Sequence, residues 1–271
     1  MISDITIGQY YKADSFIHKI DARMKIILTV LFIVMIFMCK NFLSLALVLG
    51  FVVLSVLLSA VPVLMYLRSL KPIIPIVLFT AILNMLYSGG EDILFSVWKI
   101  SISSEGLFTA IFMAVRIVLL IVASSILTYT TVPTMLTDAI EKLLSPLKLF
   151  KIPVQSLAMM MTLALRFIPT LIEEIEKITN AQKARGADFE SGKLFERIKA
   201  IVPIIIPLFI SSFRRASDLA YAMSCRCYTG ADTRTRMKQM KLKIKDFAAL
   251  LIFVIGIAGV VLLNIYFGAV I

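Results

Sequence analysis

Two short arginine segments are the residues of this sequence best suited to a specific polar contact with another protein. They read Ala184-Arg185-Gly186 and Cys225-Arg226-Cys227, and their arginines are 41 residues apart (226 minus 185). A guanidinium group carries a permanent charge and a planar fork of donors, so it can bind the carboxylates of a partner. It can also satisfy the free carbonyl groups at the C-terminal end of a helix. The residue types alone leave both roles open.

Signatures of catalysis and of nucleotide binding do not match this sequence. It has one histidine, no His-Glu-x-x-His, no Gly-x-Ser-x-Gly and no pair of acidic residues inside an apolar run. The segment from Gly186 to Lys193 comes closest to a phosphate-binding loop, but five residues instead of four separate its glycines. Leu194 also replaces the hydroxyl residue that would bind Mg²⁺. We therefore predict a turn between helices, no catalytic residue and no cofactor.

The three cysteines do not predict a metal site. Cys225 and Cys227 are spaced as metal ligands can be, but zinc needs four ligands and no second Cys or His pair completes the set. Cys39 lies at the end of a distant apolar run, and three cysteines are too few for a disulfide framework. We expect no bound metal, free thiols, and small buried side chains at positions 225 and 227.

The composition is that of an integral membrane protein. The chain has 271 residues, is 60% hydrophobic and has a mean hydropathy of +0.95. Several apolar runs approach the roughly 20 residues with which a helix spans a bilayer. We predict an all-α membrane fold with about five transmembrane helices, at residues 26–39, 42–61, 72–87, 107–128 and 247–267. The alternating pattern of 97–103 predicts a short β segment in the loop before the fourth span.

The positive charges predict how the chain is oriented in the bilayer. The formal net charge is +11, but the basic residues lie between or beside apolar runs, where they set orientation, so we expect no nucleic-acid partner. Only Lys40 and Lys99 fall on one side, whereas nineteen basic residues lie between Val132 and Asp246. The positive-inside rule then places the N-terminus in the cytoplasm and the C-terminus outside.

The charged segment between the fourth and fifth spans is predicted to be a cytoplasmic domain. It holds nineteen basic and eleven acidic residues, yet its apolar residues recur at helical spacing. We predict two long amphipathic helices, one from Val154 and one from Leu194, and expect Pro203 and Pro207 to bend the second. The predicted regions are a four-span membrane region (1–131), this domain (132–246) and a final transmembrane helix (247–271).

Arg116 is a candidate functional residue inside a predicted span. It lies about ten residues into the fourth apolar run, near the expected middle of the bilayer. An arginine at that depth is costly unless it faces protein or water, so such residues often mark functional sites. The alternative is a structural role, in which Arg116 ties helices together through carbonyl groups or a side chain such as Asn84.

Four segments carry a resemblance to a known family. They are Gly8-Gln9-Tyr10, the run from Ser15 to Lys25, Thr130-Thr131-Val132-Pro133, and Ala181-Gln182-Lys183-Ala184-Arg185-Gly186. With the second arginine segment in this position, nearly the whole chain resembles the T component, the transmembrane coupling protein, of energy-coupling factor transporters. The second segment departs from the family pattern, because cysteines flank Arg226 where the family usually has alanine and glycine.

The resemblance implies a function and a set of partners. In that family the arginine segments cap cytoplasmic coupling helices that insert into grooves on two ATP-binding cassette ATPases. It therefore implies that Ala184, Arg185 and Gly186, together with Cys225, Arg226 and Cys227, contact the ATPases. It further implies a membrane-embedded, substrate-binding S component as a second partner, and uptake of a vitamin, another micronutrient or a metal. ATP hydrolysis would then take place in the partner subunits.

Two other classes of protein are kept as alternatives. A self-sufficient permease or channel needs a midplane site with several polar groups, and only Arg116 and Asn84 are candidates for it. An intramembrane enzyme needs a catalytic constellation, which this sequence does not carry. The apolar helix faces between Val154 and Phe209, rich in methionine and isoleucine, are a soft surface suited to several partners or to ordinary helix packing.

Overall fold

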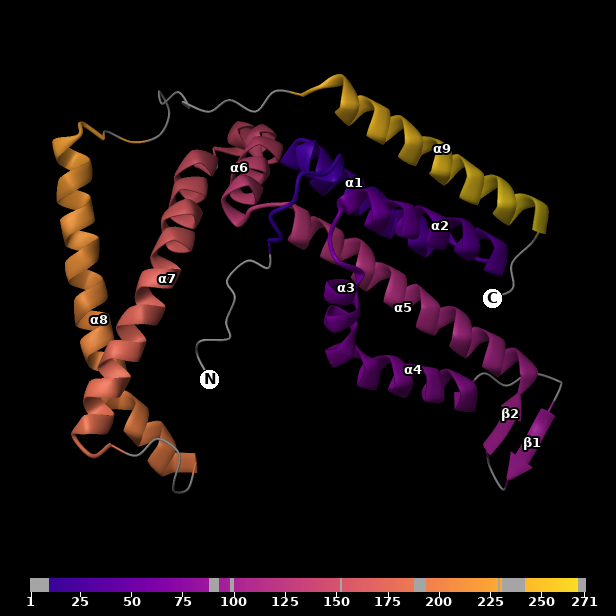
Figure 1. Cartoon of the computed structure of the whole chain (residues 1–271), viewed down its shortest axis with the longest axis horizontal. Helices are drawn as coiled ribbons and strands as arrows, with labels where there is room; N and C mark the ends of the chain where they lie inside the picture. The colour runs from indigo at the N-terminus through magenta and orange to yellow at the C-terminus, as the bar shows by residue number, and fades with distance from the viewer. Residues whose placement is uncertain are drawn as a thin grey trace. The chain divides into compact units, whose positions relative to one another are not determined.

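The computed structural model describes residues 10–87, 93–97, 100–151, 153–187, 194–228, 230 and 242–267. Its helices are α1 (Ala22–Met38), α2 (Phe42–Ser59), α3 (Val63–Leu70), α4 (Ile74–Tyr87), α5 (Ser104–Thr130), α6 (Pro133–Leu143), α7 (Val154–Ala184), α8 (Leu194–Cys225) and α9 (Ile244–Phe267). Three 3-10 helices accompany them, η1 (Ile17–Lys19), η2 (Lys71–Ile73) and η3 (Ser145–Phe150), together with strands β1 (Ile93–Val97) and β2 (Ile100–Ser103) (Figure 1).

The chain divides into two compact units. One contains the described residues between Ile140 and Lys238, with α7 and α8. The other contains those of Gly8–Ala139 and Gln239–Ile271, with α1 to α5 and α9. The all-α membrane fold predicted from the sequence is confirmed. The five predicted spans overlap α1, α2, α4, α5 and α9, but α1, with 17 residues, is not among the helical segments long and apolar enough to cross a bilayer.

Six helical segments of the described residues are long and apolar enough to cross a bilayer: Phe42–Ser59, Val63–Met85, Gly106–Thr130, Val154–Ala184, Lys199–Cys225 and Ile244–Phe267. The third predicted span therefore begins earlier than expected, because α3 and η2 lead into α4 without a break. Pro72 and Pro75 lie in η2 and in the first turn of α4, where a missing N–H costs least. By length and composition α7 and α8 also qualify, although each carries a charged face.

The β segment expected before the fourth span is a two-stranded antiparallel hairpin. β1 pairs with β2, with Phe95 opposite Ile102 and Val97 opposite Ile100. The predicted strand over 97–103 is thus wrong in extent, because the chain turns back between Val97 and Ile100 instead of running straight through. Periodicity alone placed the element but did not reveal the turn, and residues 98 and 99 lie outside the described residues.

Side chains of α1, α2, α5 and α9 form the core of the larger unit. Met35, Ile36, Val48, Phe112 and Val260 are completely or almost completely buried. α2 and α9 come so close that a Cβ added at Gly256 would lie 2.9 Å from the ring of Phe51. Many large apolar side chains on the other helix faces are exposed, as expected of helices surrounded by lipid.

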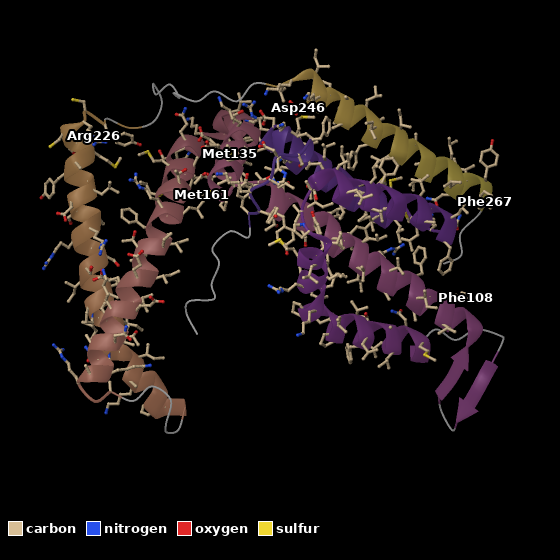
Figure 2. All side chains as sticks on the ribbon, viewed as in Figure 1. Phe108, Met135, Met161, Arg226, Asp246 and Phe267 are labelled. Atoms are coloured by element: carbon tan, nitrogen blue, oxygen red, sulfur yellow. The ribbon has the colours of Figure 1, made fainter. Side chains whose placement is uncertain are left out.

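Hydrogen bonds connect the two ends of α9 to the two ends of α1. At its start the buried carboxylate of Asp246 accepts the backbone N–H of Asp21 at 3.0 Å and that of Lys243 at 2.7 Å. At its other end Asn264 donates from Nδ2 to the carbonyl of Met38 at 2.7 Å. Figure 2 labels Asp246 at the start of α9 and Phe267 at its end. The final helix is therefore an integral part of the larger unit, although more than a hundred residues separate it from α5.

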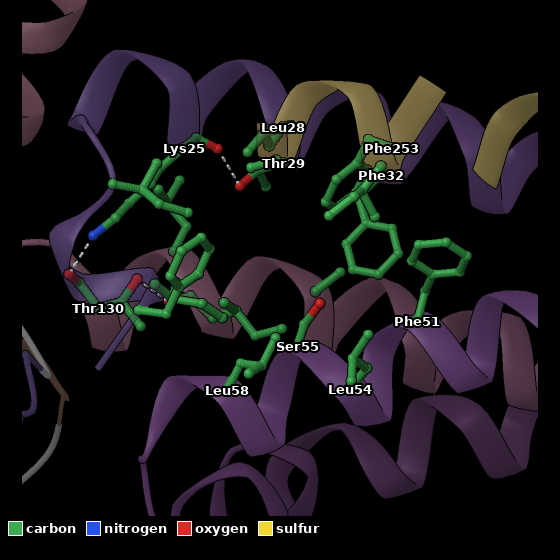
Figure 3. Close-up of a pocket in the computed structure, with 18 residues that line it drawn as sticks. Lys25, Leu28, Thr29, Phe32, Phe51, Leu54, Ser55, Leu58, Thr130 and Phe253 are labelled. Atoms are coloured by element: carbon green, nitrogen blue, oxygen red, sulfur yellow. Dashed lines mark hydrogen bonds between the residues drawn. The ribbon is translucent and has the colours of Figure 1, made fainter. Parts of the chain in front are cut away.

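A cavity of about 130 Å³ lies within the larger unit, between α1, α2, α5 and α9. Its walls are mainly apolar, and Figure 3 shows Lys25 at one end with its ammonium group directed at the carbonyl of Thr130, a contact of 2.8 Å. The Lys25 ammonium group also donates to the carbonyl of His18 at 3.5 Å. Lys25 therefore links the segment before α1 to the end of α5.

Candidate docking site

The first arginine segment forms the C-terminal cap of α7. Arg185 is the cap residue, and Gly186 follows in the left-handed region with φ of +89°. The N–H of Gly186 donates to the carbonyl of Lys183 at 2.9 Å, and that of Ala187 donates to the carbonyl of Gln182 at 3.0 Å. This pair of bonds is the Schellman motif, which ends a helix and satisfies its last carbonyl groups with main-chain donors.

The second arginine segment ends α8 in the same way. Cys227 follows Arg226 in the left-handed region with φ of +57°. The N–H of Cys227 donates to the carbonyl of Ser224 at 2.9 Å, and that of Tyr228 donates to the carbonyl of Met223 at 3.1 Å. Arg226 is therefore the structural counterpart of Arg185, and Cys227 takes the place of Gly186. Figure 2 labels Arg226 at the end of α8.

Both motif arginines expose their side chains. Within the described residues, neither guanidinium group forms a hydrogen bond or an ion pair, and the main-chain bonds already satisfy the carbonyl groups of the two helix ends. The sequence left two roles open for these arginines, capping their own helix or binding a partner. The main-chain bonds already form the cap, so the guanidinium groups are not needed for it. Two equivalent, exposed guanidinium groups at helix ends can present their donor forks to carboxylates outside the chain.

The expectation that the cysteines beside Arg226 are buried was wrong for the chain by itself. Cys225 and Cys227 are both exposed free thiols at the point where α8 ends. Among the described residues, no group of three or more His, Cys, Asp or Glu side chains could hold a metal ion.

The backbone at Cys227 leads to a stability prediction. A residue with a Cβ in the left-handed region costs about 1 kcal/mol relative to glycine, so Cys227→Gly is expected to raise slightly the thermal stability of the chain. Gly186→Val should lower it by about 1–2 kcal/mol, because a β-branched residue fits this region poorly. Thermal unfolding in detergent checks both changes, and a stabilising Gly186→Val would contradict the cap geometry.

Cys225→Ala combined with Cys227→Gly should leave uptake close to wild type.

Arg116 belongs to the larger unit and ties α5 to the end of α1. Its Nη2 donates to the carbonyl of Cys39 at 2.5 Å, and its guanidinium carbon lies 4.6 Å from the centre of the Phe112 ring. Asn84, considered as a partner from the sequence, donates instead to the carbonyl of Thr80 in its own helix. The guanidinium group therefore lies level with the C-terminal end of α1. These contacts support the structural role, whereas a functional role for Arg116 stays a prediction.

An ion pair between α7 and α8 was not predicted from the sequence. Arg215 Nη2 lies 2.6 Å from Glu174 Oε2, and Ser211 Oγ donates to Glu174 Oε1 at 3.4 Å. A helical pattern shows which residues share a face but not which face meets another helix, so it does not reveal a partner for Glu174. The sequence carries no signal for this pair, because a contact between two antiparallel helices depends on where they cross.

Comparison with known proteins identifies the family. Residues 13–238 match the family model CbiQ, described as "Cobalt transport protein". The Energy-coupling factor transporter transmembrane protein EcfT of Clostridium kluyveri is 50% identical over 269 residues, covering 99% of this chain and 100% of that protein. Proteins of the same name from Ruminiclostridium cellulolyticum (49% identical; 98% and 100% covered) and Lactococcus lactis subsp. cremoris (46%; 90% and 92%) also match. The chain thus belongs to the EcfT family of transmembrane proteins of energy-coupling factor transporters, as the resemblance of its arginine segments and N-terminal region predicted.

Proposed function

We propose that this chain is the subunit that transmits the ATP-driven motion of two cytoplasmic ATP-binding cassette ATPases to a membrane-embedded S component. The observation that carries the proposal is the pair of equivalent helix ends, each presenting one exposed arginine behind the same backbone cap. We call the C-terminal ends of α7 and α8, with Arg185 and Arg226, the docking ends. One subunit with two equivalent docking ends suits a pair of similar partners. The names of the relatives, which refer to energy coupling, agree with this role.

Each docking end works by charge and shape. An exposed arginine at the tip of a helix can enter a groove and form charge-assisted hydrogen bonds with acidic side chains there. When the ATPases close on ATP, the two ends are displaced with them. α7 and α8 are each about 30 residues long, so a displacement of their ends is passed along roughly 45 Å of helix, with bending permitted at the prolines inside them.

The S component is expected to bind the apolar faces of α7 and α8. Several large apolar side chains there are exposed, including Met160, Met161, Ile205 and Phe209. Methionine adapts its shape to different neighbours, so this surface suits more than one partner. We propose a vitamin, another micronutrient or a metal as the substrate class, in keeping with the family description as cobalt transport.

Co-purification tests the proposed function. Gentle extraction of the chain from native membranes should recover two ATP-binding cassette ATPases and a small apolar membrane protein, and the reconstituted complex should import substrate only with ATP. Recovery of the chain alone, with transport after reconstitution without other proteins, would instead support a self-sufficient permease or channel.

The proposed orientation predicts an accessibility pattern. We place the N-terminus and residues 132–246 in the cytoplasm and the C-terminus outside. On a background without native cysteines, single cysteines at Gly90 and Ile271 should react with a membrane-impermeant thiol reagent in intact cells, because both lie outside. Those at Lys12, Lys71 and Gly192 should be protected until the membrane is opened. Labelling at Gly192 in intact cells would overturn both the orientation and the coupling domain.

A further inference from the structure

We propose that Glu174 and Arg215 are positioning residues that hold the two docking ends in a fixed relation, so that Arg185 and Arg226 engage their partners together and move as one body. The inference rests on the proposed function, in which these two arginines bind the ATPases. It goes further by assigning the mechanical link between them to one ion pair.

The contact is built from both helices. Glu174 of α7 receives Arg215 Nη2 at 2.6 Å on Oε2 and Ser211 Oγ at 3.4 Å on Oε1. Ser211 and Arg215 are four residues apart, so they lie on the same face of α8. Both oxygens of one carboxylate are thus bound from one helix face, which restricts rotation of α8 about its own axis as well as sliding along α7.

The ion pair lies at equal distances along the helices from the two arginines. Glu174 precedes Arg185 by eleven residues (185 minus 174), and Arg215 precedes Arg226 by the same eleven (226 minus 215). At 1.5 Å per residue this is about 16 Å along each helix. Figure 1 shows that α7 and α8 run in opposite directions, so the docking ends lie on opposite sides of the ion pair.

Prolines make such a link necessary. Pro169 lies within α7 before Glu174, and Pro203 and Pro207 lie within α8 before Arg215. Each proline removes an intrahelical hydrogen bond and permits bending, and Figure 1 shows α8 changing direction in its first half. The ion pair joins the two segments beyond these weakened points, which are the segments that carry the arginines.

The exposure of the pair indicates a geometric role. The side chains of Arg215 and Glu174 are 38% and 23% exposed, so water screens their attraction and the pair adds little to stability. Its loss should therefore leave the chain folded while freeing the two ends to move separately. A contact that served only stability would not have this effect.

The test compares neutralised, swapped and neighbouring variants in the complete complex. Glu174→Gln and Arg215→Gln should each lower the substrate imported per ATP hydrolysed by about tenfold, with both ATPases still co-purifying. Glu174→Arg combined with Arg215→Glu should restore the ratio to within about twofold, because the ion pair is re-formed with reversed polarity. Glu173→Gln and Arg214→Gln change the same charges on the exposed neighbours and should have little effect. Wild-type ratios in both single variants, or a swap no better than they are, would overturn the proposal.

A distance measurement tests the role of the ion pair without any ATPase present. Spin labels at the exposed positions Lys183 and Ser224, on a chain without native cysteines, report the separation of the two ends in detergent without any ATPase. We expect one narrow distance distribution, a broad one in Glu174→Gln, and a narrow one again in the swapped variant. Equal widths in all three would contradict the positioning role even if the ATPases bind as proposed, whereas failure of the ATPases to bind would leave this result standing.

Discussion

A chain in which Arg185 and Arg226 are both replaced by glutamate is expected to insert into the membrane normally but to release both ATPases and lose uptake. At the acidic grooves that we propose on the ATPases, each reversal turns attraction into repulsion, and loss of one buried, hydrogen-bonded charge pair typically costs about 2–5 kcal/mol. Either single reversal should cripple uptake. Co-purification of the ATPases and ATP-dependent uptake in vesicles measure the effect.

The control for charge reversal is Arg214→Glu. Arg214 is also an exposed arginine of α8, but it lies far from the helix end, so its reversal should leave the ATPases bound. Substrate binding by the separate S component should survive the double reversal, because capture does not need coupling. Normal uptake by the doubly reversed chain would mean that these arginines do no more than end their helices.

Loss of the Asp246 carboxylate is expected to detach the start of α9. Asp246→Ala removes a buried carboxylate and leaves the partly buried backbone N–H groups of Asp21 and Lys243 without their acceptor. A hydrogen bond to a charged group contributes about 1.5–3 kcal/mol, so the change should cost about 3 kcal/mol or more. Thermal unfolding of the purified chain and proteolysis in the segment before α9 measure the loss.

The matched substitution is Asp218→Ala, which removes an exposed carboxylate from α8 and should change thermal stability little. Asp246→Asn should be intermediate, because an amide offers one acceptor atom in place of two. Equal stability of Asp246→Ala and the wild type would contradict the assignment of these two bonds as the anchor of α9.

The sequence predicted the elements of the fold better than the contacts between them. Spans follow from runs of apolar residues, which are a local property, so α2, α5 and α9 lie close to their predicted positions. Likewise, α7 and α8 begin at the predicted Val154 and Leu194. The hydrogen bonds that hold α9 connect residues more than 200 positions apart, and no local pattern encodes such pairs.

In the candidate site too, the sequence indicated the residues but not their contacts. The arginine segments stood out by residue type and spacing, and the glycine after Arg185 indicated a helix end. The left-handed backbone at Cys227 could not be predicted, because cysteine gives no sign of that conformation. The partners of Arg116 and Glu174 also depended on which helix faces meet, which only the folded chain determines.

Site-specific cross-linking tests most directly whether the ends of α7 and α8 contact the ATPases. A photoreactive benzoylphenylalanine at Lys183 or Ser224 would stand two residues before Arg185 or Arg226 and leave both arginines in place. On illumination of native membranes, both positions should capture an ATP-binding cassette ATPase, identified by mass spectrometry. The same group at Tyr266, near the end of α9 that we place outside, should capture none. Absence of any ATPase adduct from both helix ends, in membranes that still import substrate, would contradict the account.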